Sequence, residues 1–244
     1  MPIGHSFVEL ESVDSTNNYA MALAKAGKAG HGTLVFAYDQ RAGKGQRGRT
    51  WESRPGENIL LSAVLEPVAF QPAAVFGLSA AVALACHDFF IRYAGPDAVS
   101  VKWPNDLYWS DRKAGGILIE NQIKGDRWLW AIAGMGININ QVEFPPAARN
   151  PVSLKQITGR TFEVPALARE LGACLDHRYA QWEAGEPMIE SYNRVLYRRG
   201  EEVQLKKDNA VFRTRVEGVS AEGELLTRDV FERRLAYREV EWVI

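Results

Sequence analysis

The chain has 244 residues, of which 46% are hydrophobic and 24% are charged, and its formal net charge is -1. This composition is typical of a soluble globular protein and leaves room for one large domain, or a large and a small one. The balanced charge disfavours a general nucleic-acid binder, and the N-terminus lacks the basic region and apolar core of a signal peptide. The apolar run Ala73–Ala85 is too short to span a bilayer and is followed by His87 and Asp88. We therefore expect a cytoplasmic protein without a membrane segment.

The cysteines and histidines carry no signature of a site. Cys86 and Cys174 both lie in apolar, helix-like surroundings, which favours buried free thiols over a disulfide. The histidines are scattered without the spacing of metal ligands, which disfavours a transition-metal site. They are His5, His31, His87 and His177.

The first predicted elements are a short strand over Phe7–Leu10 and a helix that ends at Gly27 or Gly30. The helix begins near Asp14–Thr16, where all three residues are types that favour an N-cap. Taken alone, these polar residues need no role beyond capping.

A basic glycine loop follows the strand expected over Thr33–Tyr38. The loop, A-G-K-G-Q-R-G-R-T-W, covers Ala42–Trp51 and combines three glycines with Lys44, Arg47 and Arg49. Glycine backbone can approach a ligand closely, and successive N–H groups can form a concavity that binds anions. Arginine adds a planar fork that matches phosphate oxygens. The loop is therefore either a phosphate cradle or a solvated basic turn.

The segment after the loop excludes a dinucleotide-binding fold, although the loop also spells G-x-G-x-x-G. That fingerprint requires a helix directly after the glycines. Arg49–Asn58 instead contains Pro55-Gly56 and has no apolar helical period, and the apolar run Ile59–Leu65 predicts another strand. The long apolar stretch from Pro72 to Tyr93 then predicts a buried helix.

The segment Val99–Trp109 alternates as a strand does and is interrupted by a tight turn at Pro104–Asp106. The kink gathers a cation, a stacking surface, an amide and a carboxylate, namely Lys102, Trp103, Asn105 and Asp106. Such a set could hold a nucleotide and its Mg²⁺, which proteins bind through one or two carboxylates plus substrate phosphates. The alternative is a hairpin turn with an incidental Lys–Asp pair.

Lys113 precedes Gly115-Gly116 and an apolar strand. A lysine at a strand entry, beside open glycine backbone, can reach a ligand on the sheet, although most lysines in turns are simply exposed. A turn at Lys124–Asp126 and a strand over Trp128–Asn140 follow, with Asn138 near the end of that strand.

In the last third of the chain, predicted helices are followed by predicted short strands. Helical spacing predicts helices over Pro151–Ile157, Val164–Trp182 and Pro187–Tyr197. From Val203 to Ile244 the chain has short alternating segments separated by turns, the pattern of a small β-barrel.

The ordered set of motifs resembles the biotin–protein ligase family, in the form that lacks an N-terminal DNA-binding domain. The matching segments are D-S-T-N (Asp14–Asn17), Q-R-A-G-K-G-Q-R-G-R-T-W (Gln40–Trp51), K-W-P-N-D (Lys102–Asp106), R-K-A-G-G-I-L-I-E (Arg112–Glu120), G-M-G-I-N-I-N (Gly134–Asn140) and E-V-E-W (Glu239–Trp242). The resemblance implies an α+β fold. A class II synthetase-like catalytic domain, with a mixed or antiparallel sheet flanked by helices, is expected over residues 1–198, and a small SH3-like β-barrel over residues 199–244.

The resemblance also implies a two-step reaction. Biotin attacks the α-phosphorus of ATP, in the presence of Mg²⁺, to give biotinyl-5′-AMP, and a lysine of a biotin carboxyl carrier domain then displaces AMP. The activated intermediate is needed because a free carboxylate is a poor electrophile, and no covalent enzyme nucleophile is required. The expected partner is the carrier protein of a biotin-dependent carboxylase. No DNA or membrane is expected to bind, and the protein is expected to be a monomer or a homodimer.

The roles that the resemblance implies fall into four groups. The biotin ring system would bind Ser15, Thr16, Asn17 and Gln40, in a slot lined by Gly115, Gly116 and Ile117. The glycine loop would close over the carboxylate and phosphates through Lys44, Gly45, Gln46, Arg47 and Arg49, with Trp51 over the adenylate. Lys113 would stabilise the transferring charge, so Lys113, Arg47 and Arg49 are the expected catalytic residues. The ATP and metal side would be formed by Lys102, Trp103, Asn105, Asp106 and Asn138, with Asp106 as the metal ligand and Asn138 near adenine.

Two positions depart from the family pattern, because Lys44 and Gln46 stand where two arginines are usual. Lys44 keeps the charge without the planar fork, and Gln46 keeps hydrogen bonding without charge. We expect Arg47, Arg49 and Lys113 to suffice for retaining the adenylate.

Two other functions remain as alternatives. Lipoate–protein ligases share the architecture and the reaction logic, but K-W-P-N-D and the basic loop favour biotin. A biotin-sensing repressor is disfavoured, because the catalytic core begins within roughly fifteen residues and leaves no room for a helix-turn-helix.

Overall fold

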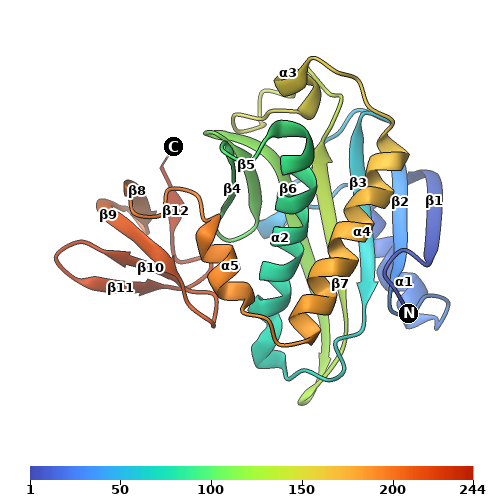
Figure 1. The fold of residues 1–244 in the computed structure, drawn as a ribbon, viewed down its shortest axis with the longest axis horizontal. Coiled ribbons are helices and arrows are strands. Elements are labelled where there is room, and N and C mark those ends of the chain that lie inside the picture. Colours follow the sequence, from blue (N-terminus) through green and yellow to red (C-terminus); the bar gives the residue numbers. More distant parts are fainter. Residues whose placement is uncertain (244) are drawn as a thin grey trace.

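The computed structural model describes residues 1–243, apart from the side chain of Arg47. A seven-stranded sheet forms the centre of the molecule, and a five-stranded sheet lies beside it at the C-terminal end of the chain (Figure 1). The strands of the large sheet are β1 (Ser6–Val13), β2 (Thr33–Gln40), β3 (Asn58–Leu65), β4 (Val99–Lys102), β5 (Asp106–Trp109), β6 (Arg112–Lys124) and β7 (Arg127–Asn138).

The large sheet has the strand order β1-β2-β3-β7-β6-β5-β4. β1 runs parallel to β2, and every other neighbouring pair is antiparallel. Every residue of β3 is buried, as expected for a central strand that is covered on both faces. The mixed sheet of the predicted α+β fold is thus present.

Helices cover both faces of this sheet. α2 (Val75–Ala94) and α4 (Val164–Glu183) pack on one face and on each other (Figure 1). α1 (Thr16–Lys25) packs on the other face against β2, β3 and β7, where Ala20, Val35, Val64 and Ile132 form a small separate core. The shorter helices are α3 (Leu154–Thr158) and α5 (Met188–Arg194).

The helical segment Pro72–Ala94 corrects one expectation. It is long and apolar enough to cross a membrane by length and composition, contrary to what the sequence indicated. The helix continues past Ala85, although His87 and Asp88 are polar, because His87 is buried and Asp88 pairs with Arg178 of α4. Most of the helix packs within the protein, where its residues belong to the main core cluster.

The five-stranded sheet is antiparallel, in the order β11-β10-β9-β8-β12. Its strands are β8 (Glu202–Lys207), β9 (Ala210–Val219), β10 (Leu225–Arg228), β11 (Glu232–Leu235) and β12 (Glu241–Trp242). Residues that face inward from it, among them Leu205, Val216 and Leu225, belong to the same core cluster as the large sheet. Hereafter residues 199–243 are called the C-terminal module. Its sheet is consistent with the predicted SH3-like barrel.

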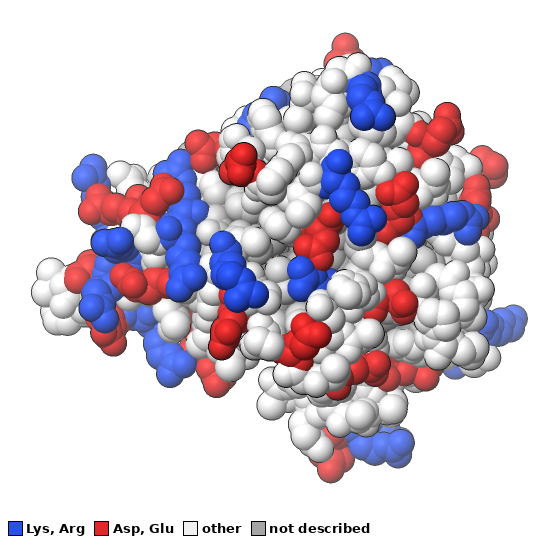
Figure 2. All heavy atoms as spheres, viewed as in Figure 1, with Lys and Arg blue, Asp and Glu red and all other residues white. Residues whose placement is uncertain are grey.

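Lysine and arginine alternate with aspartate and glutamate over the visible surface of the C-terminal module (Figure 2). Ion pairs account for part of this pattern, for example Arg228–Glu232 and Arg233–Asp229. The positive charge on this face is therefore largely offset locally.

Two further expectations are confirmed. β2 and β3 are antiparallel neighbours, and the only helical element of the described chain between them is a 3₁₀ turn at Gln46–Gly48, so the dinucleotide-binding fold is excluded. Cys86 and Cys174 are free and buried. Burial raises the pKa of both thiols, which keeps them in the unreactive protonated form.

Candidate active site

A cavity of about 470 Å³ lies on the α1 side of the large sheet. Its floor includes Leu60 of β3, Gly136 of β7 and Gly116 of β6, which are register partners across three adjacent strands. Its lining contains every site residue predicted from the sequence except Gly115 and Arg47. The side chain of Arg47 lies outside the described residues, so the prediction for it stays untested.

Gly115 faces away from the cavity. A Cβ atom at this position would lie 2.7 Å from Cδ1 of Ile137, in the core on the other side of the sheet. Successive residues of a strand point to opposite faces, so Gly116 enters the cavity and Gly115 does not. The expectation that both glycines line the slot is therefore wrong for Gly115.

The floor of the cavity requires glycine at two positions of β7. A Cβ at Gly134 would lie 2.3 Å from Oδ1 of Asn17, and one at Gly136 would lie 2.6 Å from the Trp51 ring. These side chains can approach the sheet only because the strand carries no Cβ there.

One end of the cavity is lined by hydroxyl and amide side chains. The backbone N–H and the hydroxyl of Thr16 donate to Oε1 of Gln40 at 2.7 and 3.0 Å. The Ser62 hydroxyl donates to Oδ1 of Asn17 at 2.6 Å and lies 2.8 Å from the Thr16 hydroxyl. The Asn17 amide donates to the Leu118 carbonyl and to the Glu120 carboxylate. The side chains at this end are thus held in fixed orientations before any ligand arrives.

Ser15 occupies the N-cap position of α1, but its side chain makes no capping hydrogen bond. It is only 1% exposed and lines the cavity. Ser15 is therefore the N-cap residue of α1 by position, but its hydroxyl does not cap the helix.

The glycine loop folds back on itself at the mouth of the cavity. The N–H of Trp51 donates to the Gly43 carbonyl at 2.9 Å, and the N–H of Gly45 donates to the Arg49 carbonyl at 2.7 Å. Lys44 donates to Asn18 and lies 3.6 Å from Glu120, and Arg49 lies 3.8 Å from Glu241 of the C-terminal module. In this arrangement carboxylates at the rim hold the two described cations of the loop.

The ring of Trp51 lies on the glycine floor. A Cβ at Gly116 would come within 3.2 Å of this ring, and the Lys113 ammonium is 5.7 Å from a ring centroid. The indole N–H is buried and has no hydrogen-bond partner among the described residues. Such an unmet donor in a cavity is available to a ligand.

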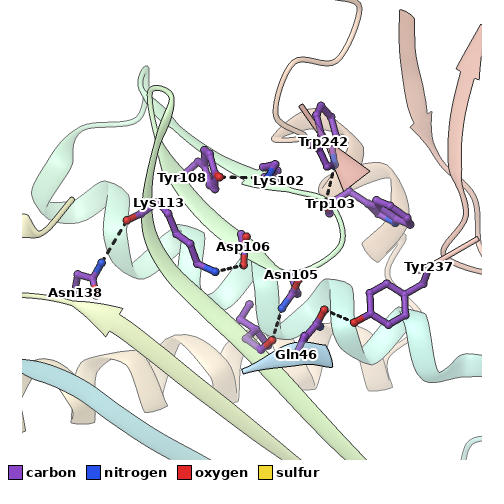
Figure 3. Close-up of polar contacts among 11 residues, drawn as sticks. Gln46, Lys102, Trp103, Asn105, Asp106, Tyr108, Lys113, Asn138, Tyr237 and Trp242 are labelled. Atoms are coloured by element: carbon purple, nitrogen blue, oxygen red, sulfur yellow. Dashed lines mark hydrogen bonds and ion pairs between the residues drawn. The ribbon is translucent and has the colours of Figure 1, made fainter. Parts of the chain in front are cut away.

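An ion pair occupies the centre of the cavity (Figure 3). Nζ of Lys113 is 2.6 Å from Oδ1 of Asp106, which lies across from Gly116 in the β5–β6 register. The neighbouring Asn105 donates from its amide to the Ile117 carbonyl at 2.6 Å. The Lys–Asp pair that the sequence allowed within the K-W-P-N-D turn therefore forms with Lys113 instead of Lys102.

Lys102 instead turns toward aromatic rings. Its ammonium donates to the Tyr108 hydroxyl at 3.2 Å and lies 5.0 and 5.6 Å from the ring centroids of Tyr108 and Trp242. Burial lowers the pKa of Lys102 to about 8, and the cations Lys113, Arg149 and Arg49 act in the same direction against the opposing effect of Asp106. This end of the cavity therefore carries more positive charge than its carboxylates offset.

Asn138 and Trp103 border the cavity but are engaged in the protein. The Asn138 amide donates to the Lys113 carbonyl at 3.3 Å (Figure 3) and to the Val152 carbonyl at 3.1 Å, which ties the segment after β7 to the entry of β6. Trp103 is 2% exposed and donates from its indole N–H to the Gly223 carbonyl. Both side chains position their neighbours in the described structure.

Two groups of lining residues were not anticipated. One comes from the segment after β7 and includes Phe144 and Arg149, and the other comes from the C-terminal module. The module contributes Tyr237, Val240, Glu241 and Trp242. E-V-E-W was the one available signal for the second group, but it was assigned only to the barrel; the first group carries no recognised motif.

The cavity offers few protein ligands for the expected Mg²⁺ ion. Among the described residues no group of three or more His, Cys, Asp or Glu side chains could hold a metal. Asp106 offers one carboxylate in the cavity, with Lys113 bound to one of its oxygens. A single carboxylate fits Mg²⁺ that arrives on nucleotide phosphates, because such ions keep most of their ligands from phosphate and water.

Both the sequence and the fold match those of known proteins. Residues 9–138 match the model of the Biotin/lipoate A/B protein ligase family. The chain belongs to this family. The matched residues include the hydroxyl and amide end of the cavity, the glycine loop and the Lys113–Asp106 pair.

Relatives resemble this family member along most of its length. It is 31% identical over 230 residues to the biotin–[acetyl-CoA-carboxylase] ligase of Paracoccus denitrificans, an alignment that covers 90% of this chain and 92% of that protein. It is 30% identical to the bifunctional ligase/repressor BirA of Bacillus spizizenii, over 92% of this chain and 70% of that protein. The structure of biotin protein ligase from Aquifex aeolicus, in complex with biotin and ATP, has the same fold, with a TM-score of 0.80, 24% identity and coverage of 98% and 99% of the two chains.

Proposed function

We propose that the chain is an ATP-dependent biotin–protein ligase, an enzyme that forms biotinyl-5′-AMP and transfers biotin to a lysine of a carrier domain. The observation that carries the proposal is the order of groups along one cavity. Across the strand order of the sheet, the hydroxyl and amide end around Thr16 and Gln40 of β2 is followed by the Lys113–Asp106 pair of β6 and β5 and then by the cationic end at Lys102 of β4. Relatives that align over most of the chain are named biotin ligases, which supports biotin over lipoate.

The first step joins biotin to AMP. A carboxylate oxygen of biotin forms a bond to the α-phosphorus of ATP, and the bond from that phosphorus to the bridging oxygen of pyrophosphate breaks. Negative charge builds up on the transferring phosphoryl group. A fixed cation is effective there, because it needs no reorganisation during the reaction. Lys113 is this cation, and Asp106 holds its ammonium at 2.6 Å in the cavity.

Biotin recognition is assigned to the hydroxyl and amide end of the cavity. Ser15, Thr16, Asn17 and Gln40 present hydroxyl and amide groups there, and the hydrogen bonds between them fix their orientation. The ureido ring of biotin has N–H donors and a carbonyl acceptor, so an uncharged set of donors and acceptors suits it.

Mg²⁺ would be held by Asp106 together with the nucleotide phosphates. When bound, the ion would neutralise phosphate charge. Lys102 faces the phosphates from the other side of the K-W-P-N-D turn. The glycine loop, including Arg47 and Arg49, closes over the ligands, and its present ion pairs at the rim must exchange for contacts with phosphate.

In the second step the ε-amine of the carrier lysine attacks the carbonyl carbon of biotinyl-AMP, and AMP leaves. The partner is a biotin carboxyl carrier domain of a carboxylase, the class implied by the name of the P. denitrificans relative. We assign residues 1–198 to the catalytic domain and residues 199–244 to the small barrel domain. The protein acts in the cytoplasm, as a monomer or a homodimer, and without DNA.

The test is incubation of the purified chain with biotin, Mg-ATP and a carrier domain, followed by mass spectrometry. The expected result is the mass of one biotinyl group on a single lysine of the carrier, together with release of pyrophosphate. A parallel reaction with lipoate should leave the carrier unmodified. Modification by lipoate alone would replace the proposal with the lipoate ligase activity.

A further inference from the structure

We propose that Arg149 binds the pyrophosphate that leaves ATP in the first step, and so acts in adenylate formation but not in biotin transfer. This inference rests on the proposed function and adds to it a residue outside the motifs of the catalytic core. Arg149 lines the cavity from the segment that joins β7 to α3.

The backbone beside Arg149 is fixed to Lys113. The N–H of Lys113 donates to the Asn150 carbonyl at 2.8 Å, and the N–H of Val152 donates to the Lys113 carbonyl at 2.9 Å. The Asn150 side chain donates to the Asp111 carbonyl, so the neighbour of Arg149 is bound to the start of β6 through both its backbone and its side chain. Arg149 therefore keeps its place next to the residue assigned to the α-phosphate.

The charges of the lining leave Arg149 available for an anion. Lys44, Arg49 and Lys113 each lie within 4 Å of a carboxylate, at Glu120, Glu241 and Asp106 respectively. Arg149 is exposed and makes no hydrogen bond or ion pair within residues 1–243, Arg47 aside. It is near enough to Lys102 and Tyr108 to act on both electrostatically.

The geometry of in-line displacement assigns the end of the cavity near Lys102 and Arg149 to the leaving pyrophosphate. In an in-line displacement the attacking and leaving oxygens lie on opposite sides of the phosphorus. Biotin enters from the hydroxyl and amide end, and Lys113 marks the position of the phosphorus. The pyrophosphate then departs on the far side, where Lys102 and Arg149 lie. Arginine matches two phosphate oxygens at once, which suits a group whose negative charge rises as the bond breaks.

The experiment compares Arg149→Gln and Arg149→Lys with a control, Arg160→Gln. Arg160 is an exposed arginine near the same segment, with its guanidinium over the Phe162 ring, and it does not line the cavity. Single-turnover adenylate formation from biotin and Mg-ATP is measured first. Pyrophosphorolysis of added biotinyl-AMP and transfer from added biotinyl-AMP to a carrier domain are measured next. Binding of magnesium pyrophosphate to the ligand-free protein is measured by calorimetry.

Loss of a charge-assisted contact with the leaving group should slow adenylate formation and pyrophosphorolysis by roughly 10- to 100-fold in Arg149→Gln, and weaken pyrophosphate binding by a similar factor. Arg149→Lys should recover part of the loss. Transfer from added biotinyl-AMP should change less than about twofold, because pyrophosphate has already left, and Arg160→Gln should match wild type throughout.

Two outcomes would overturn the inference. One is an equal loss in adenylate formation and in transfer, which would indicate a structural effect. The other is unchanged pyrophosphorolysis and pyrophosphate binding in Arg149→Gln. Failure of the proposed function gives a different result, because wild-type protein would then make no biotinyl-AMP at all.

Discussion

Lys113 and Asp106 form an ion pair in the lining of the cavity, so substitution of Lys113 separates catalysis from folding. Lys113→Ala removes the cation assigned to the α-phosphate and leaves Asp106 partly exposed to water. We expect single-turnover adenylate formation to fall by about 100-fold or more. The free energy of unfolding should fall by only about 1 kcal/mol, because the pair is partly exposed.

The measurements for Lys113→Ala are rapid-quench adenylate formation and urea unfolding. Lys28→Ala, an exposed lysine beyond α1 and outside the cavity, is the control and should leave both unchanged. An unchanged adenylation rate in Lys113→Ala would remove this residue from the mechanism.

The charged form of Lys102 lowers the stability of the folded protein, because the side chain is largely buried. Its pKa is lowered to about 8, chiefly by burial, whereas an unfolded lysine has a pKa of about 10.4. Below pH 8 the residue is charged in both states, so the full cost of burying the charge is present. Between pH 8 and about 10.4 only the unfolded state keeps the proton, and the cost declines as pH rises.

Lys102→Met should therefore stabilise the fold while weakening ATP binding. We expect a gain of roughly 1–2 kcal/mol in the free energy of unfolding at pH 7, discounted for partial exposure, and a smaller gain near pH 10. Lys206→Met, an exposed lysine on β8, is the matched control and should change stability by less than about 0.5 kcal/mol. A gain that does not shrink with rising pH would contradict this explanation.

At the scale of elements, α2 and α4 are joined by a two-point ion pair beneath the sheet. Arg178 donates from Nε and Nη2 to the two carboxylate oxygens of Asp88, at 2.5 and 3.0 Å. Burial raises the pKa of Asp88, but hydrogen bonding and the charges of Arg178 and His87 outweigh it and hold the pKa below its usual value. The pair therefore stabilises the fold above the ordinary aspartate pKa of about 3.9, and this stabilisation is lost as the pH falls through the lower folded value.

Arg178→Met should lower the free energy of unfolding by roughly 1–3 kcal/mol at pH 7, between the values for exposed and fully buried pairs. The effect should shrink on acidification. Arg228→Met, which breaks the exposed Arg228–Glu232 pair, is the control and should cost less than about 0.5 kcal/mol. An equal decrease in the free energy of unfolding of the two variants at pH 7 would show that burial does not strengthen the α2–α4 ion pair.

Most elements could be predicted from local patterns because their causes are local. The alternation of apolar and polar residues predicted the strands at one edge of the sheet. Residue types that favour N-caps, together with glycines, predicted where helices begin and end. The helix predicted over Pro72–Tyr93 is present as α2, but its apolar length was underestimated, because His87 and Asp88 interrupt the apolar run in the sequence and Asp88 finds its partner, Arg178, only on a helix 90 residues away. Gly115 was misassigned for a related reason: which of two adjacent glycines faces the ligand depends on strand register, which the sequence does not encode locally.

At the scale of the whole molecule, the C-terminal module forms part of the active-site wall. Trp242 donates from its indole N–H to the Trp103 carbonyl at 3.2 Å (Figure 3), and Trp103 donates to the Gly223 carbonyl at 2.9 Å. Glu241 pairs with Arg49 of the glycine loop. These contacts join residues that are far apart in the sequence, so the motifs identified the residues of the cavity but not the wall that the module supplies.

Tyr237 links this module to the residue at which the glycine loop departs from its family pattern. Its hydroxyl donates to Oε1 of Gln46 (Figure 3). An arginine would offer only donors, whereas glutamine offers an acceptor for the Tyr237 proton, and this hydrogen bond holds the loop against the module. We expect Tyr237→Phe to speed dissociation of biotinyl-AMP by about 2- to 10-fold, the net worth of one hydrogen bond. Stopped-flow dissociation and biotinylation of bystander proteins are the measurements.

The matched control is Tyr38→Phe, which deletes a hydroxyl that donates to Glu9 on the β1–β2 edge, outside the cavity lining. Because Tyr237→Phe keeps the aromatic ring, the T-shaped contact with Trp103 should persist and adenylate formation should stay near the wild-type rate. Faster dissociation in Tyr237→Phe alone would assign Gln46 a positive role in retaining the adenylate. Equal dissociation rates in wild type and both variants would leave retention to Arg47, Arg49 and Lys113, as the sequence first suggested.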